Sequence, residues 1–115
     1  MTTTVWHNPR CSKSRLTLAL LEEHGIEPEI RLYLDNAPTA AELSSVLSKL
    51  GLSAWELLRR GEKIFKELDL NQHSTEDAII AAMVEHPILI ERPVVIRGDA
   101  AALGRPPENV LTLLD

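Results

Sequence analysis

The stretch TTVWHNPRCSKSRLTLALLEEHG, residues 3–25, decides how the chain begins to fold. Thr3–Trp6 is rich in β-branched and aromatic residues, which is typical of a strand. The pair Asn8-Pro9 then indicates a turn. Apolar residues at helical spacing predict a helix from Ser12 to about His24, and Gly25 is a plausible stop. The opening therefore predicts a strand, a turn that holds Cys11, and a helix.

The rest of the chain continues this α/β pattern. Thr39 with Glu42 and Ser53 with Glu56 form capping boxes at the starts of two helices. The predicted elements after the first helix are, in order, a strand over Ile30–Leu34, the two capped helices, a short helix over 61–68, a helix from Ser74 to His86-Pro87, strand material over 88–97 broken by Pro93, a weaker strand over Ala100–Leu103 and a helix from Pro106.

This order resembles a thioredoxin-like fold. We expect a mixed β-sheet flanked by helices, with an all-helical subdomain inserted in the middle. The whole chain, residues 1–115, is predicted to be one domain. Its thioredoxin-like part covers about 1–36 and 86–115, and the helical insertion covers about 37–85.

Composition excludes several classes of protein. The 115 residues are 44% apolar and 25% charged with a net charge of −5, which is ordinary for one globular domain and unlike a nucleic-acid-binding protein. The sequence opens with no apolar signal segment and contains no apolar run of membrane-spanning length, so we expect no membrane partner. The cytoplasm, where thiols stay reduced, is the expected compartment.

Charge is distributed unevenly around the single cysteine. Residues 1–21 carry Arg10, Lys13 and Arg15 and no acidic residue, whereas all 17 Asp and Glu follow. Cys11 precedes a predicted helix, so free backbone N–H groups and the positive end of the helix dipole favour its thiolate. His7 is a further candidate for a positive charge beside this thiol. A buried structural cysteine is the alternative, but such residues usually lie among apolar neighbours.

Three kinds of cysteine chemistry can be compared with the residues that follow Cys11. A tyrosine-phosphatase loop needs an arginine where Thr17 stands, so that loop is absent. A dithiol oxidoreductase needs a cysteine where Ser14 stands, which leaves a Cys-x-x-Ser motif as in monothiol glutaredoxins. Nothing beyond His7 supports a cysteine protease. The four histidines show no metal-ligand spacing, so we expect no metal site.

The same residues resemble a known family. The stretch His7-Asn8-Pro9-x-Cys11-x-x-Ser14-Arg15 is similar to the active-site loop of the glutaredoxin-coupled arsenate reductases. Further fragments match that family in order along almost the whole chain: Glu27-Pro28, Tyr33-Leu34, Leu57-Leu58-Arg59, His86-Pro87-Ile88-Leu89-Ile90, Arg92-Pro93 and Gly104-Arg105-Pro106-Pro107-Glu108.

The resemblance implies an activity and its partners. It implies arsenate reduction to arsenite through a Cys11–arsenate adduct, with glutathione as co-substrate, glutaredoxin as partner and no bound cofactor. Single residues take roles by motif. Cys11 is the catalytic nucleophile; Arg59, Arg92 and Arg105 bind the oxyanion; His7, Asn8, Lys13, Ser14 and Arg15 tune the thiolate, with Ser14 hydrogen-bonded to it; and Pro93 is a cis-proline candidate.

Two alternatives remain open at this point. A monothiol, glutathione-linked oxidoreductase with another substrate would keep Cys11 but not need Arg59, Arg92 and Arg105. A non-catalytic regulatory binding protein of the same fold would tolerate Cys11→Ser. Without the family motifs, each of these three arginines would be interpreted as an ordinary charged residue on the surface. Glu62 is close enough in sequence to pair with Arg59.

Overall fold

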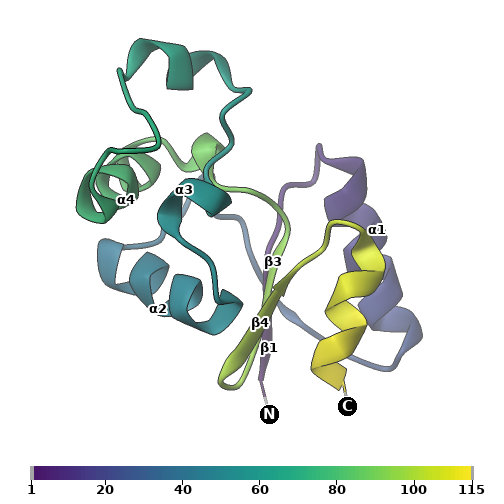
Figure 1. The fold of residues 1–115 in the computed structure, drawn as a ribbon. Coiled ribbons are helices and arrows are strands. Elements are labelled where there is room, and N and C mark those ends of the chain that lie inside the picture. Colours follow the sequence, from purple (N-terminus) through teal and green to yellow (C-terminus); the bar gives the residue numbers. More distant parts are fainter. Residues whose placement is uncertain (1, 115) are drawn as a thin grey trace. The chain divides into compact units, whose positions relative to one another are not determined.

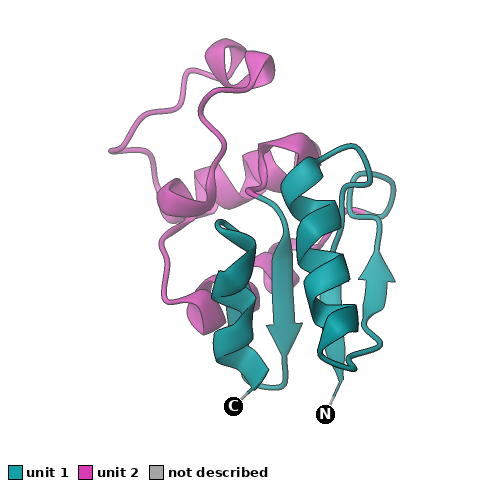
Figure 2. Ribbon diagram, turned by 90° about the vertical axis from the view of Figure 1, so that its right-hand side faces the viewer, with its two compact units in different colours: residues 1–36, 92–115 teal, residues 37–91 magenta. Residues whose placement is uncertain are grey.

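The computed structural model describes residues 2–114. The chain divides into two compact units, residues 1–36 with 92–115 and residues 37–91, which Figure 2 colours separately. The chain passes from one unit to the other after Asn36 and after Glu91. The domain division expected from the sequence, with an insertion over about 37–85, stays a prediction.

Backbone pairing explains why the segment up to Glu91 belongs to the second unit. Leu58 forms an isolated antiparallel bridge with Ile90. The backbone N–H of Arg59 donates to Leu89 O at 2.7 Å, and that of Glu91 donates to Leu57 O at 2.9 Å. These bonds tie the segment up to Glu91 to the helical unit.

The first unit is built on a four-stranded mixed sheet (Figure 1). Its strands are β1 (Thr3–Trp6), β2 (Glu29–Arg31), β3 (Val94–Arg97) and β4 (Ala100–Leu103). They lie in the order β2-β1-β3-β4; β1 pairs in parallel with β2, and the β1–β3 and β3–β4 pairs are antiparallel. The expected mixed sheet is therefore confirmed.

Two helices accompany the sheet within this unit. Helix α1 (Ser12–Glu23) and the 3-10 helix η3 (Pro107–Leu114) lie side by side, as Figure 1 shows. A core cluster of four fully buried residues joins them to the strands: Val5, Leu21, Val95 and Val110. Burial of each such side chain stabilises a fold by about 1.5–3 kcal/mol. This core packs helix α1, whose N-cap residue is Cys11, against the sheet.

The second unit is helical, as expected. It contains α2 (Ala40–Leu50), α3 (Ala54–Leu57), the 3-10 helix η1 (Lys63–Glu67), α4 (Glu76–Glu85) and the 3-10 helix η2 (Pro87–Leu89). Both predicted capping boxes are present, at Thr39 with Glu42 and at Ser53 with Glu56. Helix α2 ends at Gly51, whose φ of 70° suits a residue without a side chain. Helix α4 contacts both α2 and α3 in this unit, and all three helices carry buried apolar residues.

The structure defines three helices more closely than the sequence pattern did. Helix α4 is capped by Thr75, whose hydroxyl accepts from the backbone N–H of Ala78, and not by Ser74, whose hydroxyl accepts from the N–H of Asn71. Helix α3 stops at Leu57 because Leu58 turns to extended backbone and pairs with Ile90. The short helix expected over 61–68 is the 3-10 helix η1.

The predicted second strand was too long. The alternation of Ile30, Leu32 and Leu34 indicated a strand to residue 34, but β2 ends at Arg31 and a turn follows. Those three apolar side chains are 40–51% exposed, whereas Tyr33 between them is fully buried. The alternation therefore marked the exposed side of the segment and not the core side.

The C-terminal elements also differ in detail from the prediction. Strand material expected over 88–97 is a 3-10 turn up to Leu89 and then β3 from Val94. The weaker strand at Ala100–Leu103 is confirmed as β4, and the last helix begins at Pro107, one residue after the predicted Pro106. Within the part of the chain that the structure describes, no helix has the length and apolar character needed to cross a bilayer.

Candidate functional site

Cys11 lies at the first end of helix α1, as the sequence predicted. It is the N-cap residue, with extended backbone angles of φ −95° and ψ 122°, and it is 9% exposed. Its N–H donates to Asn8 O at 3.0 Å, which closes the loop after β1, and its C=O accepts from the N–H of Arg15 at 3.0 Å. The free backbone N–H groups of Ser14 and Lys13 in the first turn donate to the thiol.

The environment of Cys11 favours the thiolate. Burial alone would raise the pKa of the thiol, since a charge is costly away from water. The backbone N–H of Ser14, the guanidinium of Arg92 and the backbone N–H of Lys13 outweigh that effect and hold the pKa of Cys11 below its ordinary value. A lowered pKa is the property of a reactive cysteine and not of a structural one.

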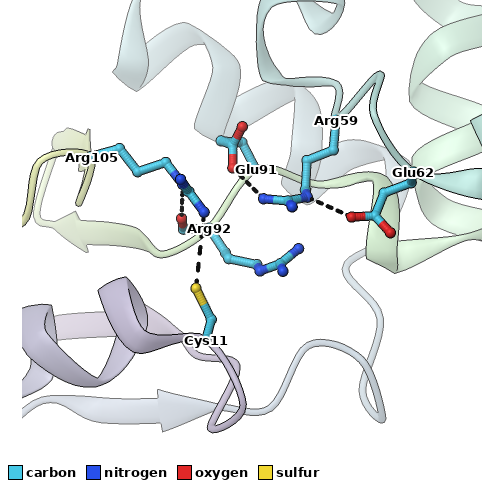
Figure 3. A network of polar contacts seen from close by, with 6 residues as sticks. All are labelled: Cys11, Arg59, Glu62, Glu91, Arg92 and Arg105. Carbon is cyan, nitrogen blue, oxygen red and sulfur yellow. Dashed lines mark hydrogen bonds and ion pairs between the residues drawn. The ribbon is translucent and has the colours of Figure 1, made fainter.

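Two of the three expected arginines meet at this thiol. Arg105 Nη2 points to Cys11 Sγ at 3.9 Å, and Arg105 Nε donates to the backbone O of Arg92 at 2.8 Å (Figure 3). The contact of Arg105 with sulfur is long, so the hydrogen bond and charge of Arg92 are the main guanidinium effect on the pKa of Cys11. The Arg92–Pro93 peptide bond is cis, the state named for Pro93 from the sequence, and the Arg105–Pro106 bond is cis as well.

His7, Asn8 and Ser14 form a buried network behind the thiol. His7 Nδ1 lies 2.7 Å from Ser14 Oγ, and the backbone N–H of Asn8 donates to the same hydroxyl at 3.1 Å. The sequence predicted a hydrogen bond from Ser14 to the thiolate; the group that supplies it is the backbone N–H, while the hydroxyl bonds His7 and Asn8. Burial and the charge of Arg15 lower the pKa of His7.

The remaining basic residues lie at the rim of the loop. Arg15 Nη1 donates to Pro9 O at 2.7 Å, so its side chain braces the loop that precedes Cys11. The backbone O of Lys13 accepts from Thr17 Oγ1 at 2.8 Å, and the side chains of Lys13 and Arg10 are exposed. Direct tuning of the thiolate by these side chains stays a prediction.

Arg59 belongs to the helical unit and is held there by two carboxylates. Its Nε donates to Glu62 at 3.1 Å and its Nη1 to Glu91 at 2.7 Å, as Figure 3 shows. Burial would lower the pKa of Arg59, but the charges and hydrogen bonds of Glu91 and Glu62 outweigh it and raise that pKa. Participation of Arg59 in an oxyanion site stays a prediction.

Glu91 is the charged residue here that sequence reasoning missed. It lies 32 residues after Arg59, so no helical spacing relates the two. Glu62, three residues after Arg59, was identified as a possible partner because such pairs meet on helices.

Among residues 2–114, no group of three or more His, Cys, Asp and Glu side chains is placed to bind a metal ion.

A thioredoxin-like sheet, a cysteine with a lowered pKa at a helix N-terminus and two guanidiniums beside it are typical of proteins that use a cysteine as nucleophile. Known proteins narrow this class. The family model of the ArsC family matches residues 6–113, so the chain belongs to that family.

Similar proteins cover almost the full chain. The Escherichia coli K12 protein named Uncharacterized protein YfgD is 52% identical over 112 residues, which is 96% of this chain and 94% of that protein. A Neisseria meningitidis serogroup A protein named Arsenate reductase is 47% identical, covering 96% of each chain. A solved structure described as arsenate reductase from Vibrio cholerae is 47% identical, covers 98% of each chain and superposes with a TM-score of 0.95.

Proposed function

We propose that this protein is an arsenate reductase that converts arsenate to arsenite through a covalent adduct at Cys11. The observation that carries the proposal is the lowered pKa of Cys11 beside the guanidinium of Arg92, with Arg105 Nη2 3.9 Å from the sulfur. Relatives named arsenate reductase at 47% identity over 96% of the chain support the choice of oxyanion.

The first step joins the thiol to arsenic. The Cys11 thiolate attacks arsenic, an S–As bond forms, and one As–O bond breaks, with the departing oxygen leaving as water after protonation. We propose that Arg92 and Arg105, whose guanidiniums lie beside Cys11, bind the negative oxygens of the adduct, because guanidiniums can bind two such oxygens at once. We assign Arg59 to the same oxyanion on the basis of its motif position.

The second stage needs thiols from outside the chain. Cys11 is the only cysteine, so the protein can hold the adduct but cannot form an internal disulfide. We propose that glutathione replaces a further oxygen on arsenic and that glutaredoxin then attacks the glutathione sulfur. A mixed disulfide forms, and the bond between the glutathione sulfur and arsenic breaks with its electron pair left on arsenic, which is reduced from As(V) to As(III). Water then cleaves the bond between Cys11 and arsenic, and arsenite is released. The cytoplasm, which keeps these thiols reduced, is the proposed compartment.

The test is arsenite formation in a reconstituted mixture. The purified protein is supplied with arsenate, glutathione and glutaredoxin, and arsenite is separated and quantified. We expect turnover only when all three are present and none with Cys11→Ser, which keeps the size of the side chain but loses its nucleophilicity. An absence of arsenite from folded wild-type protein with a reduced Cys11, both with glutathione and glutaredoxin and with a thioredoxin system, would overturn the proposed function.

Omitting glutathione or glutaredoxin in turn, or replacing both, tests whether these two thiols are the reductants. If a thioredoxin system replaces glutathione and glutaredoxin at equal rate, arsenate reduction stands but the reductant is wrong.

Arg92→Ala separates arsenate reduction from the alternative glutathione-linked oxidoreductase. We expect it to lower kcat/KM for arsenate by roughly a hundredfold or more.

A further inference from the structure

Gly104 occupies the tightest packing position beside the candidate site. It is buried and follows strand β4 directly, one residue before Arg105. A methyl group at this position would overlap Thr17 Oγ1 and would come within 2.6 Å of Pro93 Cγ and 3.1 Å of Pro93 Cδ. Carbon atoms in contact are ordinarily about 3.5–4.0 Å apart. Only glycine therefore fits between helix α1 and Pro93 in this arrangement.

The neighbours of Gly104 have little freedom to move aside. Thr17 is fully buried, and its hydroxyl donates to Lys13 O at 2.8 Å, within the first turns of the helix that Cys11 caps. Pro93 is a rigid ring held by the backbone, since its C=O accepts from the N–H of Gly104 at 3.0 Å. A side chain at position 104 would separate these elements and not merely rotate one of them.

The two arginines at the thiol depend on the same two segments. Arg92 precedes Pro93 and Arg105 follows Gly104. A second bond, from Arg105 Nε to Arg92 O at 2.8 Å, runs beside the one between Gly104 and Pro93. Asn109 Nδ2 donates to Arg105 O at 2.9 Å and fixes the other side of that residue. The segments 92–93 and 104–105 thus form one hydrogen-bonded pair that packs onto α1 at Thr17.

We propose that Gly104 is a positioning residue: its missing side chain lets the paired segments 92–93 and 104–105 close onto Thr17, which places Arg92 and Arg105 at Cys11. The inference rests on the proposed function for its catalytic consequence, whereas the placement itself concerns the arginines and the thiol alone. Gly104 acts through the two guanidiniums and touches neither the sulfur nor a substrate.

The test compares Gly104→Ala with Gly61→Ala. Gly61 is a matched control, because a methyl group there would meet no atom within 4 Å. The rate of Cys11 alkylation by iodoacetamide is measured across pH. Gly104→Ala is expected to move the midpoint upward and to slow alkylation several-fold near neutral pH, because the guanidinium that favours the thiolate is displaced. Gly61→Ala should follow the wild type.

A second-site variant separates placement from simple loss of stability. Thr17→Ala removes the hydroxyl that the new methyl group would overlap, so Gly104→Ala/Thr17→Ala should recover part of the wild-type alkylation profile, with Thr17→Ala alone as baseline. The kinetic counterpart is a fall of about tenfold or more in kcat/KM for arsenate in Gly104→Ala, partly recovered in the double variant.

Each outcome decides the proposal. A folded Gly104→Ala with the alkylation profile of Gly61→Ala would overturn it. Failure of both Gly104→Ala and the double variant to fold would also overturn it, since Gly104 would then serve core packing and not arginine placement. Alkylation needs no arsenate, so a wild-type protein that reduces no arsenate would sink the proposed function while the alkylation profiles still test Gly104.

Discussion

At the scale of single residues, the neighbours of Cys11, and not its exposure, lower the pKa of its thiol. Burial works against its charged form, and the N–H groups of Ser14 and Lys13 together with the guanidinium of Arg92 more than compensate. The backbone donors come with the helix, so substitution of side chains cannot remove them. Arg92 is the one contributor that a side-chain replacement tests cleanly.

Arg92→Ala should raise the pKa of Cys11, because the hydrogen bond and positive charge that favour the thiolate are lost. At a pH below the wild-type midpoint, alkylation by iodoacetamide should therefore slow several-fold. The measurement is the pH profile of alkylation, with Arg60→Ala as control, since Arg60 stacks on the ring of Trp55 at 4.6 Å. An unchanged profile in Arg92→Ala would contradict the role given to its guanidinium.

Arg15→Ala should raise the pKa of His7, because a nearby positive charge opposes protonation of the imidazole. The pKa of His7 in the folded state lies below its ordinary value. As the pH falls, the imidazole of His7 is therefore protonated in the unfolded chain at a higher pH than in the folded one. Stability that His7 contributes is therefore present above pH 6.5 and is lost as pH falls through its lowered folded pKa.

Proton NMR titration of the His7 ring measures this prediction directly. Burial remains in Arg15→Ala, so the pKa should recover only in part. Arg10→Ala is the control, because burial and Arg15 are the causes of the lowered value and Arg10 is not among them. A His7 titration that is the same in wild type and Arg15→Ala would show that burial alone sets it.

At the scale of elements, the helical unit depends on its capping boxes. Thr39→Ala removes the oxygen that accepts from the N–H of Glu42 at 3.1 Å and leaves a first-turn donor without that partner. The expected cost is roughly 0.5–2 kcal/mol in the free energy of unfolding, measured by urea denaturation. Ser44→Ala, at an exposed position within the same helix, should be neutral or slightly stabilising. Equal effects of the two would refute the capping role.

Glu62 and Glu91 together form a clamp on Arg59, and this clamp has a consequence for anion binding. Glu91 Oε1 lies 2.7 Å from the guanidinium and competes with any oxyanion that Arg59 binds. Glu91→Gln keeps the shape of the side chain and removes its charge, so the KM for arsenate should fall a few-fold. Glu85→Gln is the control, since the side chain of Glu85 is 78% exposed and lies 4.0 Å from His86. A higher KM in Glu91→Gln would show that the clamp assists Arg59 instead of competing.

At the scale of the whole molecule, what the sequence predicted well was local. The turn with Cys11, helix α1 and both capping boxes follow from residues within one or two turns of each other, and they appear where expected. Other features depend on distant segments, which local patterns do not show. Leu58 leaves the helix pattern because it pairs with Ile90, and Arg59 is held by Glu91, 32 residues away. The roles of Arg92 and Arg105 came from family motifs, because no local pattern relates them to Cys11.

One measurement tests most directly whether Cys11 and its arginines form an oxyanion site. Wild-type protein is alkylated with iodoacetamide at fixed pH and ionic strength, with rising arsenate and no thiol present. We predict that arsenate protects Cys11 in a saturable manner and that Arg92→Ala, compared as the ratio of rates with and without arsenate, loses most of that protection. Alkylation of wild-type Cys11 at the same rate with and without arsenate would contradict the presence of an oxyanion site at this thiol.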